Sequence, residues 1–392
     1  MLRSRIWWAL VATALLLRAA IVRVTPDYVP IHDDHSYLVH AVALVKTGGY
    51  PVFETQGIVA PTAYRAPGFP VVLALARSVL GHDLLGPRLV QVLIATVGVG
   101  LVGIVAHKIW GRRTALAATA LAALSPVLIV YSGSLISEPL FVVLELGALA
   151  CALEARRRPR WAIAAGMLGG AAALTRPAGL ALLLALALCA GGRRTALVVV
   201  CLGALTVAPW TIRNAVVFHT FIPVSTEAGN TLAGTYNDKS AGDGLWRDPR
   251  LSNVYPRERA KTIGDGPATD AILTRAVIGY VADHPLQPLR VAWFNAGRLA
   301  GVAPTSFASH SLDTISLPHT AAPVVRLGLM LMAALALVGV FTRAARRAPA
   351  GWWLAAAMVL ASTLLVNAEQ RFAVPLQAFL APLAVLPFTR GD

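Results

Sequence analysis

The chain has 392 residues, of which 57% are apolar and only 14% are charged, against about 25% charged in an ordinary soluble domain. Its mean hydropathy of +0.66 leaves too little polar surface to cover a water-soluble globule. These values also exclude a disordered chain, a coiled coil and a disulfide-stapled secreted domain. The sequence therefore predicts an all-α, polytopic membrane protein.

The charge is strongly basic, with 34 Lys and Arg against 19 Asp and Glu and a formal net charge of +15. The basic residues stand in short clusters between apolar runs and do not interleave with aromatic residues on one patch. Such clusters are typical of membrane topology control, so nucleic acid is not expected as a partner.

Apolar runs of helical length make up most of the chain. A helix needs about 20 mostly apolar residues to cross a bilayer, so we expect about ten spans, two of them short. The expected spans are 6–24, 86–107, 114–132, 137–153, 161–175, 178–192, 195–211, 322–342, 350–367 and 371–388.

The basic clusters predict the orientation of these spans. With the N-terminus in the cytoplasm, every even-numbered connection carries arginine or lysine, as the positive-inside rule requires. We therefore expect a multi-pass protein of the inner or plasma membrane with both termini in the cytoplasm. The clusters are Arg3 and Arg5; Lys108, Arg112 and Arg113; Arg156, Arg157, Arg158 and Arg160; Arg193 and Arg194; Arg343, Arg346 and Arg347; and Arg390.

Two segments of the single transmembrane domain 1–392 then lie outside. The first, 25–85, contains a short helix, a Gly-Gly-Tyr-Pro turn and an apolar run at 69–81, which is too short to span and is expected to lie on the membrane surface. The second, 212–321, should hold helices at 268–283 and 286–302. Neither part of this second segment shows a core of its own, so we expect it to lie on the membrane domain.

Arg290 and Arg298 are expected on the polar side of the amphipathic stretch 286–302.

Asp33 and Asp34 follow the first span by only a few residues. A carboxylate held near the hydrocarbon edge is a functional candidate, since it can accept a proton from an attacking hydroxyl. The alternative is that both are solvated loop acids that cap a helix starting near His35. The run from His32 to His35 also suggests metal ligands, but adjacent side chains cannot all point at one ion. A divalent metal is therefore an open alternative that the spacing does not indicate, and no cofactor is certain.

Glu138 opens the fourth span from the outside, beside Pro139. A first-turn acid is ordinary helix-start chemistry, but the short preceding loop also places Glu138 on the same side as Asp33, which makes it a catalytic candidate.

Four arginines stand at outer helix ends, against the positive-inside trend, and their planar forks suit a phosphate or a carboxylate. They are Arg65, Arg176, Arg213 and Arg371. The alternative is structural ion pairing, with Arg371 bound to Glu369 and Arg213 bound to Glu227.

The order of short motifs along the chain resembles the GT-C membrane glycosyltransferases, in particular the branch that contains the protein O-mannosyltransferases and lipid A aminoarabinose transferases. The resemblance covers most of residues 1–375. Its motifs are the acidic pair with Tyr37; Gly49–Tyr50–Pro51; Thr62 to Pro70; Arg88 to Gln91; Ser137 to Leu140; Leu174 to Pro177; Pro209 to Asn214; and Glu369–Gln370–Arg371–Phe372.

The resemblance implies a polyprenyl-phosphate-linked sugar as donor, a lipid or glycan acceptor, an extracytoplasmic active site and inversion at the anomeric carbon. By position, Asp33 matches the catalytic aspartate of the first loop and Glu138 a second acidic position near the site. Arg65 stands where relatives bind the donor phosphate. The motifs add Tyr37, Tyr64 and Glu369 as candidate substrate-binding residues.

Two departures limit the resemblance. Tyr64 replaces a glutamate of the lipid A-modifying relatives, which argues against a comparable metal site. The outer segment lacks a separate folded domain, so a macromolecular acceptor is not indicated. The alternatives left open are a transporter or flippase for an anionic lipid or sugar, and a catalytically inactive subunit of an envelope assembly.

Overall fold

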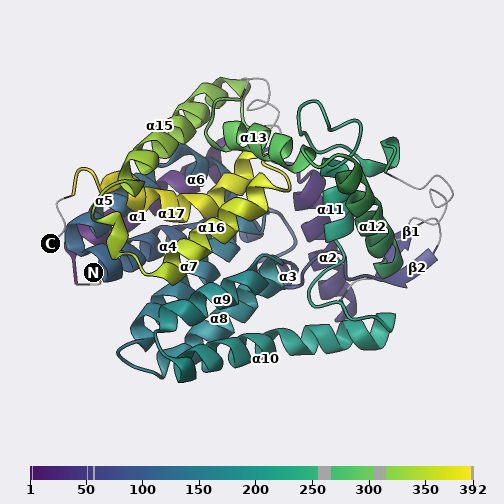
Figure 1. Ribbon diagram of the computed structural model, residues 1–392, viewed down its shortest axis with the longest axis horizontal. Coiled ribbons are helices and arrows are strands. Elements are labelled where there is room, and N and C mark those ends of the chain that lie inside the picture. Colours follow the sequence, from purple (N-terminus) through teal and green to yellow (C-terminus); the bar gives the residue numbers. More distant parts are fainter. Residues whose placement is uncertain are drawn as a thin grey trace.

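The computed structural model describes the whole chain except residues 2, 51, 56–57, 255–265, 304–311, 313–314 and 390–392. Of the residues named above, Pro51 and Arg390 lie outside the described part. Helices form nearly all of the regular structure (Figure 1).

A helix occupies each of the ten places where a span is expected. These helices are α1 Arg5–Val24, α4 Leu85–Trp110, α5 Arg112–Leu124 continued by α6 Pro126–Val130, α7 Glu138–Ala155, α8 Trp161–Thr175, α9 Gly179–Ala190, α10 Arg193–Phe218, α15 Ala322–Val340, α16 Ala350–Leu364 and α17 Ala373–Val385.

By length and hydropathy, four helices of the described residues can each cross a membrane alone, and the bent pair α5–α6 raises the number to five. The other apolar helices are shorter or carry more acidic residues, so the number of spans is not fixed by the helices themselves.

Two expected boundaries are wrong. The span 114–132 is not one helix, because Pro126 has no backbone N–H and begins a new helix that is bent by 59° from α5. The span expected to end at 211 continues as α10 to Phe218, so the second outer segment begins inside a helix.

Small residues let two of the helices approach closely. A Cβ at Gly166 would lie 2.6 Å from the carbonyl oxygen of Val199, and one at Gly170 would lie 2.6 Å from that of Gly203. This spacing of glycines is typical of tightly packed membrane helices. It fixes α8 against α10 on the lower side of the molecule (Figure 1).

The main apolar core lies among α4, α5, α7, α9, α16 and α17. Trp352 is fully buried there and meets Trp110 and Phe379 edge to face, with ring centroids 5.2 and 5.3 Å apart. This core holds the bundle that carries the outer segments.

The first outer segment contains α2 His32–Thr47, a hairpin of β1 Val52–Thr55 and β2 Ile58–Pro61, and α3 Gly68–Leu80. The strands are antiparallel, with Val52 opposite Pro61. The all-α expectation is therefore correct apart from this hairpin, where β-branched and aromatic residues favour extended backbone.

Helix α3 has two apolar faces. Phe69, Leu73 and Ala76 are buried, whereas Leu75 and Val79 are 62% and 79% exposed. An outward apolar stripe of this kind is what the expected interfacial helix requires.

The second outer segment contains α11 Ala228–Thr235, the short turn η2 Pro249–Leu251, α12 Pro267–Asp283 and α13 Gln287–Leu299. It does have a small apolar core, contrary to expectation, because α11 packs on α12 and each contributes buried side chains. This core consists of Ala233, Tyr236, Val254, Leu273, Val277 and Val291.

The segment also lies on the membrane bundle, as expected, since Asn295 donates to the carbonyl oxygen of Leu364 at 2.9 Å and Thr235 to that of Val366 at 2.6 Å. Arg290 is exposed, but Arg298 is not on a polar outer side: it is buried and donates to the carbonyl oxygen of Gly244 at 3.0 Å. Eight residues along a helix turn a side chain by about 80°, which separates the two arginines.

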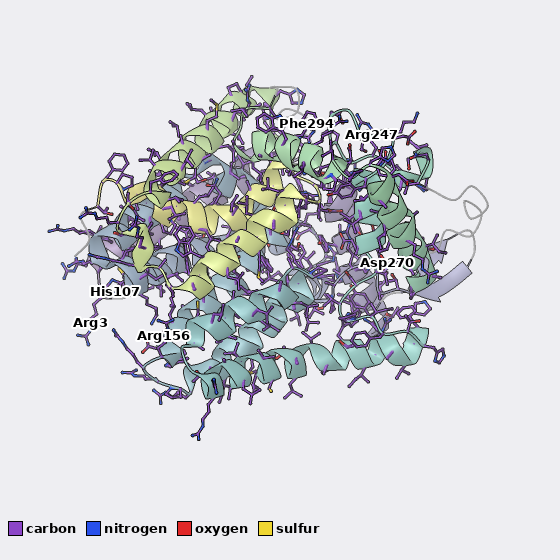
Figure 2. The ribbon with its side chains drawn as sticks, viewed as in Figure 1. Arg3, His107, Arg156, Arg247, Asp270 and Phe294 are labelled. Atoms are coloured by element: carbon purple, nitrogen blue, oxygen red, sulfur yellow. The ribbon has the colours of Figure 1, made fainter. Side chains whose placement is uncertain are left out.

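The basic connections and the outer segments lie at opposite ends of the molecule. Both termini are at one end (Figure 1), and Figure 2 shows Arg3, His107 and Arg156 at that same end, far from Arg247 and Asp270.

Candidate functional site

A cavity of about 1280 Å³ opens between the start of α2, the loop before α3, α11, α13 and the chain just before α17. Among the described residues, its charged lining is balanced, with four acids and four arginines: Asp33, Glu227, Asp243 and Glu369; Arg65, Arg247, Arg298 and Arg371. Arg247 and Phe294, which are labelled in Figure 2, belong to its outer part.

Five of these residues form a row of alternating charge, Glu227–Arg65–Asp33–Arg371–Glu369, which we call the charge row. Arg65 binds one oxygen of Asp33 through Nη2 and binds Glu227 through Nη1 at 2.6 Å. Arg371 binds the other oxygen of Asp33 through Nη2 at 2.6 Å and pairs through Nε with Glu369 at 2.8 Å. The Asp33 carboxylate is thus held from both sides at the cavity wall.

Local structure holds both Asp33 and Arg65 in place within the charge row. Asp33 lies in the first turn of α2, where the helix dipole favours an anion. His32 before it has a φ of 51°, an uncommon backbone conformation for a non-glycine residue, at the point where the chain enters the helix. Arg65 is held by Ser36, which accepts from its Nε at 3.1 Å, and by Tyr50, whose hydroxyl donates to its carbonyl oxygen at 2.8 Å.

Electrostatics keep the centre of the row fully charged. Burial alone would raise the pKa of Asp33, but the positive charges of Arg371 and Arg65 outweigh it and hold that pKa well below its usual range. Burial would likewise lower the pKa of both arginines, but the carboxylates around each of them, Asp33 first, together outweigh it and raise both pKa values. Asp33 is therefore an anion at neutral pH.

Asp34 points away from the cavity. It is 2% exposed and accepts a hydrogen bond from the hydroxyl of Tyr28, which itself accepts from the backbone N–H of Leu135 at 3.0 Å. Burial raises the pKa of Asp34 to about 7, against the effect of the Tyr28 hydrogen bond. The alternative of two solvated loop acids is wrong, because α2 begins at His32 and buries one acid of the pair.

The buried Glu138 and the half-buried Arg176 form an ion pair that does not line the cavity, with Nη1 2.8 Å from Oε1. Arg176 also donates to Ser137 Oγ at 3.1 Å, and the same hydroxyl accepts from Tyr37 at 3.1 Å. The Tyr37 ring lies 4.9 Å from the Arg65 guanidinium carbon. These residues therefore form a layer behind the charge row.

Arg213 lies apart from this arrangement. It donates to the carbonyl oxygen of Thr62 at 3.0 Å and lies 5.0 Å from the Trp210 ring, and it does not line the cavity. Its expected pairing with Glu227 is wrong, since Glu227 binds Arg65. The expected pairing of Arg371 with Glu369 is confirmed.

Of the remaining candidates, Tyr64 and Glu369 line the cavity and Tyr37 does not. Sequence reasoning missed most of the wall contributed by the second outer segment, above all Asn230, Trp246 and Arg247. The run Trp246–Arg247–Asp248 in a Gly- and Asn-rich stretch is the one local signal that could have drawn attention to it. Within the described residues, no three His, Cys, Asp or Glu side chains are placed to hold a metal ion.

Comparisons with known proteins give a partial family match. Residues 64–218 match the family described as dolichyl-phosphate-mannose-protein mannosyltransferase. No protein of curated function matches the chain.

Several solved structures share the fold. The apo oligosaccharyltransferase of Archaeoglobus fulgidus is 13% identical with a TM-score of 0.60, over 98% of this chain and 51% of that one. The archaeal oligosaccharyltransferase AglB of Archaeoglobus fulgidus, in complex with an inhibitory peptide and a dolichol-phosphate, is 14% identical with a TM-score of 0.59, over 97% and 50%. ArnT from Cupriavidus metallidurans bound to undecaprenyl phosphate is 17% identical with a TM-score of 0.48, over 98% and 78%. This chain thus spans about half the length of the oligosaccharyltransferases.

Proposed function

We propose that this chain is a membrane glycosyltransferase of the GT-C type. The family match over residues 64–218 and the fold shared with the oligosaccharyltransferases support this proposal. The donor is a sugar linked to a polyprenyl phosphate, and the acceptor is a hydroxyl of a lipid or glycan of the cell envelope. The reaction takes place at the extracytoplasmic face and inverts the anomeric carbon.

The observation that carries this proposal is the position of Asp33 between two arginines in the wall of a large cavity. A carboxylate is a suitable acceptor for the proton of an attacking hydroxyl. Two arginines with planar forks are suited to a phosphate. A base next to an anion-binding pair is what the proposed reaction requires.

In the proposed step, the acceptor oxygen forms a bond to the anomeric carbon while the bond from that carbon to the phosphate oxygen breaks. The bonding electron pair leaves with the lipid phosphate, and the hydroxyl proton moves to Asp33. Arg65 and Arg371 stabilise the negative charge that grows on the phosphate.

The same arginines bind Asp33 on both sides, so the donor phosphate competes with Asp33 for their N–H groups. As the arginines turn to the phosphate, the pKa of Asp33 rises and the carboxylate becomes a better base. Glu227 and Glu369 remain as the outer partners that keep both guanidinium groups in place.

Two further features support the lipid donor and the membrane topology. AglB, which shares this fold, has been captured with a dolichol-phosphate. The basic connections lie at the end of the molecule opposite the outer segments (Figure 2), which supports about ten spans, cytoplasmic termini and an extracytoplasmic site.

The proposal is tested by transfer from radiolabelled polyprenyl-phosphate sugars in membranes that hold the protein and an envelope extract. We expect wild type to release sugar from the lipid and Asp33→Asn to lose this activity. Asp27→Asn is the matched control, because Asp27 is an exposed acid of the same outer segment. Equal transfer by wild type and Asp33→Asn would contradict the assignment of the base.

One observation favours the transporter alternative. Glu145 lies in the interior of α7, is fully buried, and neither carboxylate oxygen has a hydrogen-bond partner within the described residues. Ionisable groups at such depth are typical of transport pathways. A transporter would move the radiolabelled sugar lipid across the bilayer without releasing the sugar. Such movement in wild type, and its loss in Glu145→Gln, would favour this alternative.

A further inference from the structure

A second, smaller cavity of about 230 Å³ adjoins the main one. The two cavities share Tyr64, Asn230 and Trp246, so these three side chains stand between them. The Tyr64 ring lies 5.1 Å from the guanidinium carbon of Arg65, which places the smaller cavity one side chain beyond the charge row.

The lining of the smaller cavity combines polar and charged side chains, Asp248 and Arg250 among them, with the aromatic rings of Tyr64 and Trp246. Asp270 and Thr269 come from the first turn of α12, Asn230 from α11, and the partly exposed indole of Trp246 forms the shared wall. Carboxylate, amide and hydroxyl groups together supply both hydrogen-bond donors and acceptors to the hydroxyls of a sugar ring. The face of an indole can cover the C–H side of the same ring.

Asp270 has hydrogen-bonding capacity to spare. Its Oδ1 accepts from the backbone N–H of Gly229 at 2.6 Å, and within the described residues this is the only hydrogen bond of the Asp270 side chain. The Oδ2 atom therefore remains available to accept from a ligand.

The smaller cavity does not suit the lipid donor. The lining residues that the structure describes all belong to the two outer segments, from Tyr64 and from Thr226 to Leu273, and none of them belongs to a predicted span. A prenyl chain would need a continuous apolar path to the bilayer, and the charged and polar side chains of this lining interrupt such a path. Its volume is below that of a typical drug-sized pocket, so it suits one ring and not a chain of several.

We infer that the smaller cavity is a sugar subsite for the acceptor. It binds the unit that neighbours the one whose hydroxyl faces Asp33, so the preferred acceptor is a glycan or glycoside of at least two sugar units. This inference rests on the proposed glycosyl transfer.

The first test measures binding, independently of transfer. Saturation-transfer NMR on the full chain in lipid nanodiscs would use methyl glycosides of single hexoses, methyl glycosides of disaccharides, and N-acetylserine amide as a peptide-like probe. We expect the disaccharides to bind most tightly and Asp270→Asn to weaken them about tenfold, in line with the loss of one charged hydrogen bond. Asp283→Asn, an exposed acid at the far end of the same helix, should not change binding.

Trp246→Phe keeps an aromatic face and should retain disaccharide binding, which separates loss of the subsite from loss of folding. Equal binding of single hexoses and disaccharides, tighter binding of the serine probe, or unchanged binding in Asp270→Asn would each overturn the subsite.

The second test uses transfer from a radiolabelled polyprenyl-phosphate hexose to the same glycosides. Asp270→Asn should raise KM for the disaccharide more than for the single hexose. If wild type transfers equally well to both and Asp270→Asn is silent, the subsite fails while the proposed function stands. If nothing is transferred but disaccharides bind with the expected dependence on Asp270, the proposed function fails while the sugar site stands.

Discussion

Arg65 gives the sharpest test of the charge row, because it makes three contacts that a shorter or neutral side chain cannot reproduce. Its two Nη atoms bind Asp33 and Glu227, and its Nε donates to Ser36. Hydrogen bonds to charged groups contribute about 1.5–3 kcal/mol each. Since the side chains of Asp33 and Glu227 are each 27% exposed, Arg65→Gln should cost about 3 kcal/mol, near the lower end for two such bonds.

The loss of transfer should be larger than the loss of stability explains. Removing one donor that stabilises a growing negative charge lowers kcat by about 10²–10³-fold, and we expect Arg65→Gln to fall in this range. Arg65→Lys keeps the charge but not the fork, so it should retain more activity than Arg65→Gln.

Initial rates of release from a radiolabelled polyprenyl-phosphate sugar, measured beside thermal unfolding in detergent, check both expectations. Arg213→Gln is the matched control, because Arg213 also stands at an outer helix end but does not line the cavity. A loss in Arg213→Gln as large as in Arg65→Gln, or full activity in Arg65→Gln, would refute the assignment of phosphate binding to the charge row.

Three further predictions concern the surroundings of the site. The folded state raises the pKa of Asp34 to about 7, so the wild type should lose stability as the pH rises from about 4 to about 7. In unfolding measurements, Asp34→Asn should therefore be more stable than wild type at pH 8, by at most about 4 kcal/mol, and nearly equal to it at pH 4.5. Glu138→Gln should lower stability more than transfer, since its carboxylate binds Arg176 behind the cavity; a loss of kcat at unchanged stability would instead make Glu138 a reacting group. Gly170→Leu should separate α8 from α10 and reduce the folded yield in membranes, whereas Gly279→Ala, at a site with open space, should not.

Hydrophobic length and basic clusters were sufficient to predict the helical bundle. They depend on about 20 consecutive residues and on the charges that flank them, so they can be predicted without the partners of any residue. The break at Pro126 was missed because a count of apolar residues gives no weight to a proline inside the run, and the end of α10 at Phe218 because a helix can continue past its apolar residues.

The candidate site was only partly predictable for the same reason. The motif order singled out Asp33, Arg65 and Arg371, but not that one carboxylate would join both arginines. Asp33 and Arg371 are 338 residues apart in sequence, and Arg65 and Glu227 are 162 apart. No local pattern encodes such a pairing.

The sequence by itself thus determined that the chain forms apolar helices with basic connections, and which acids and arginines stand at their outer ends. The tertiary structure alone decided which of these groups meet. It turned Asp33 to the cavity and Asp34 to the interior, since successive residues of a helix point about 100° apart and only one of the two could face each side. It also brought the second outer segment over the charge row, because the small core of that segment packs against the bundle and carries Glu227 and Asn230 to the cavity wall.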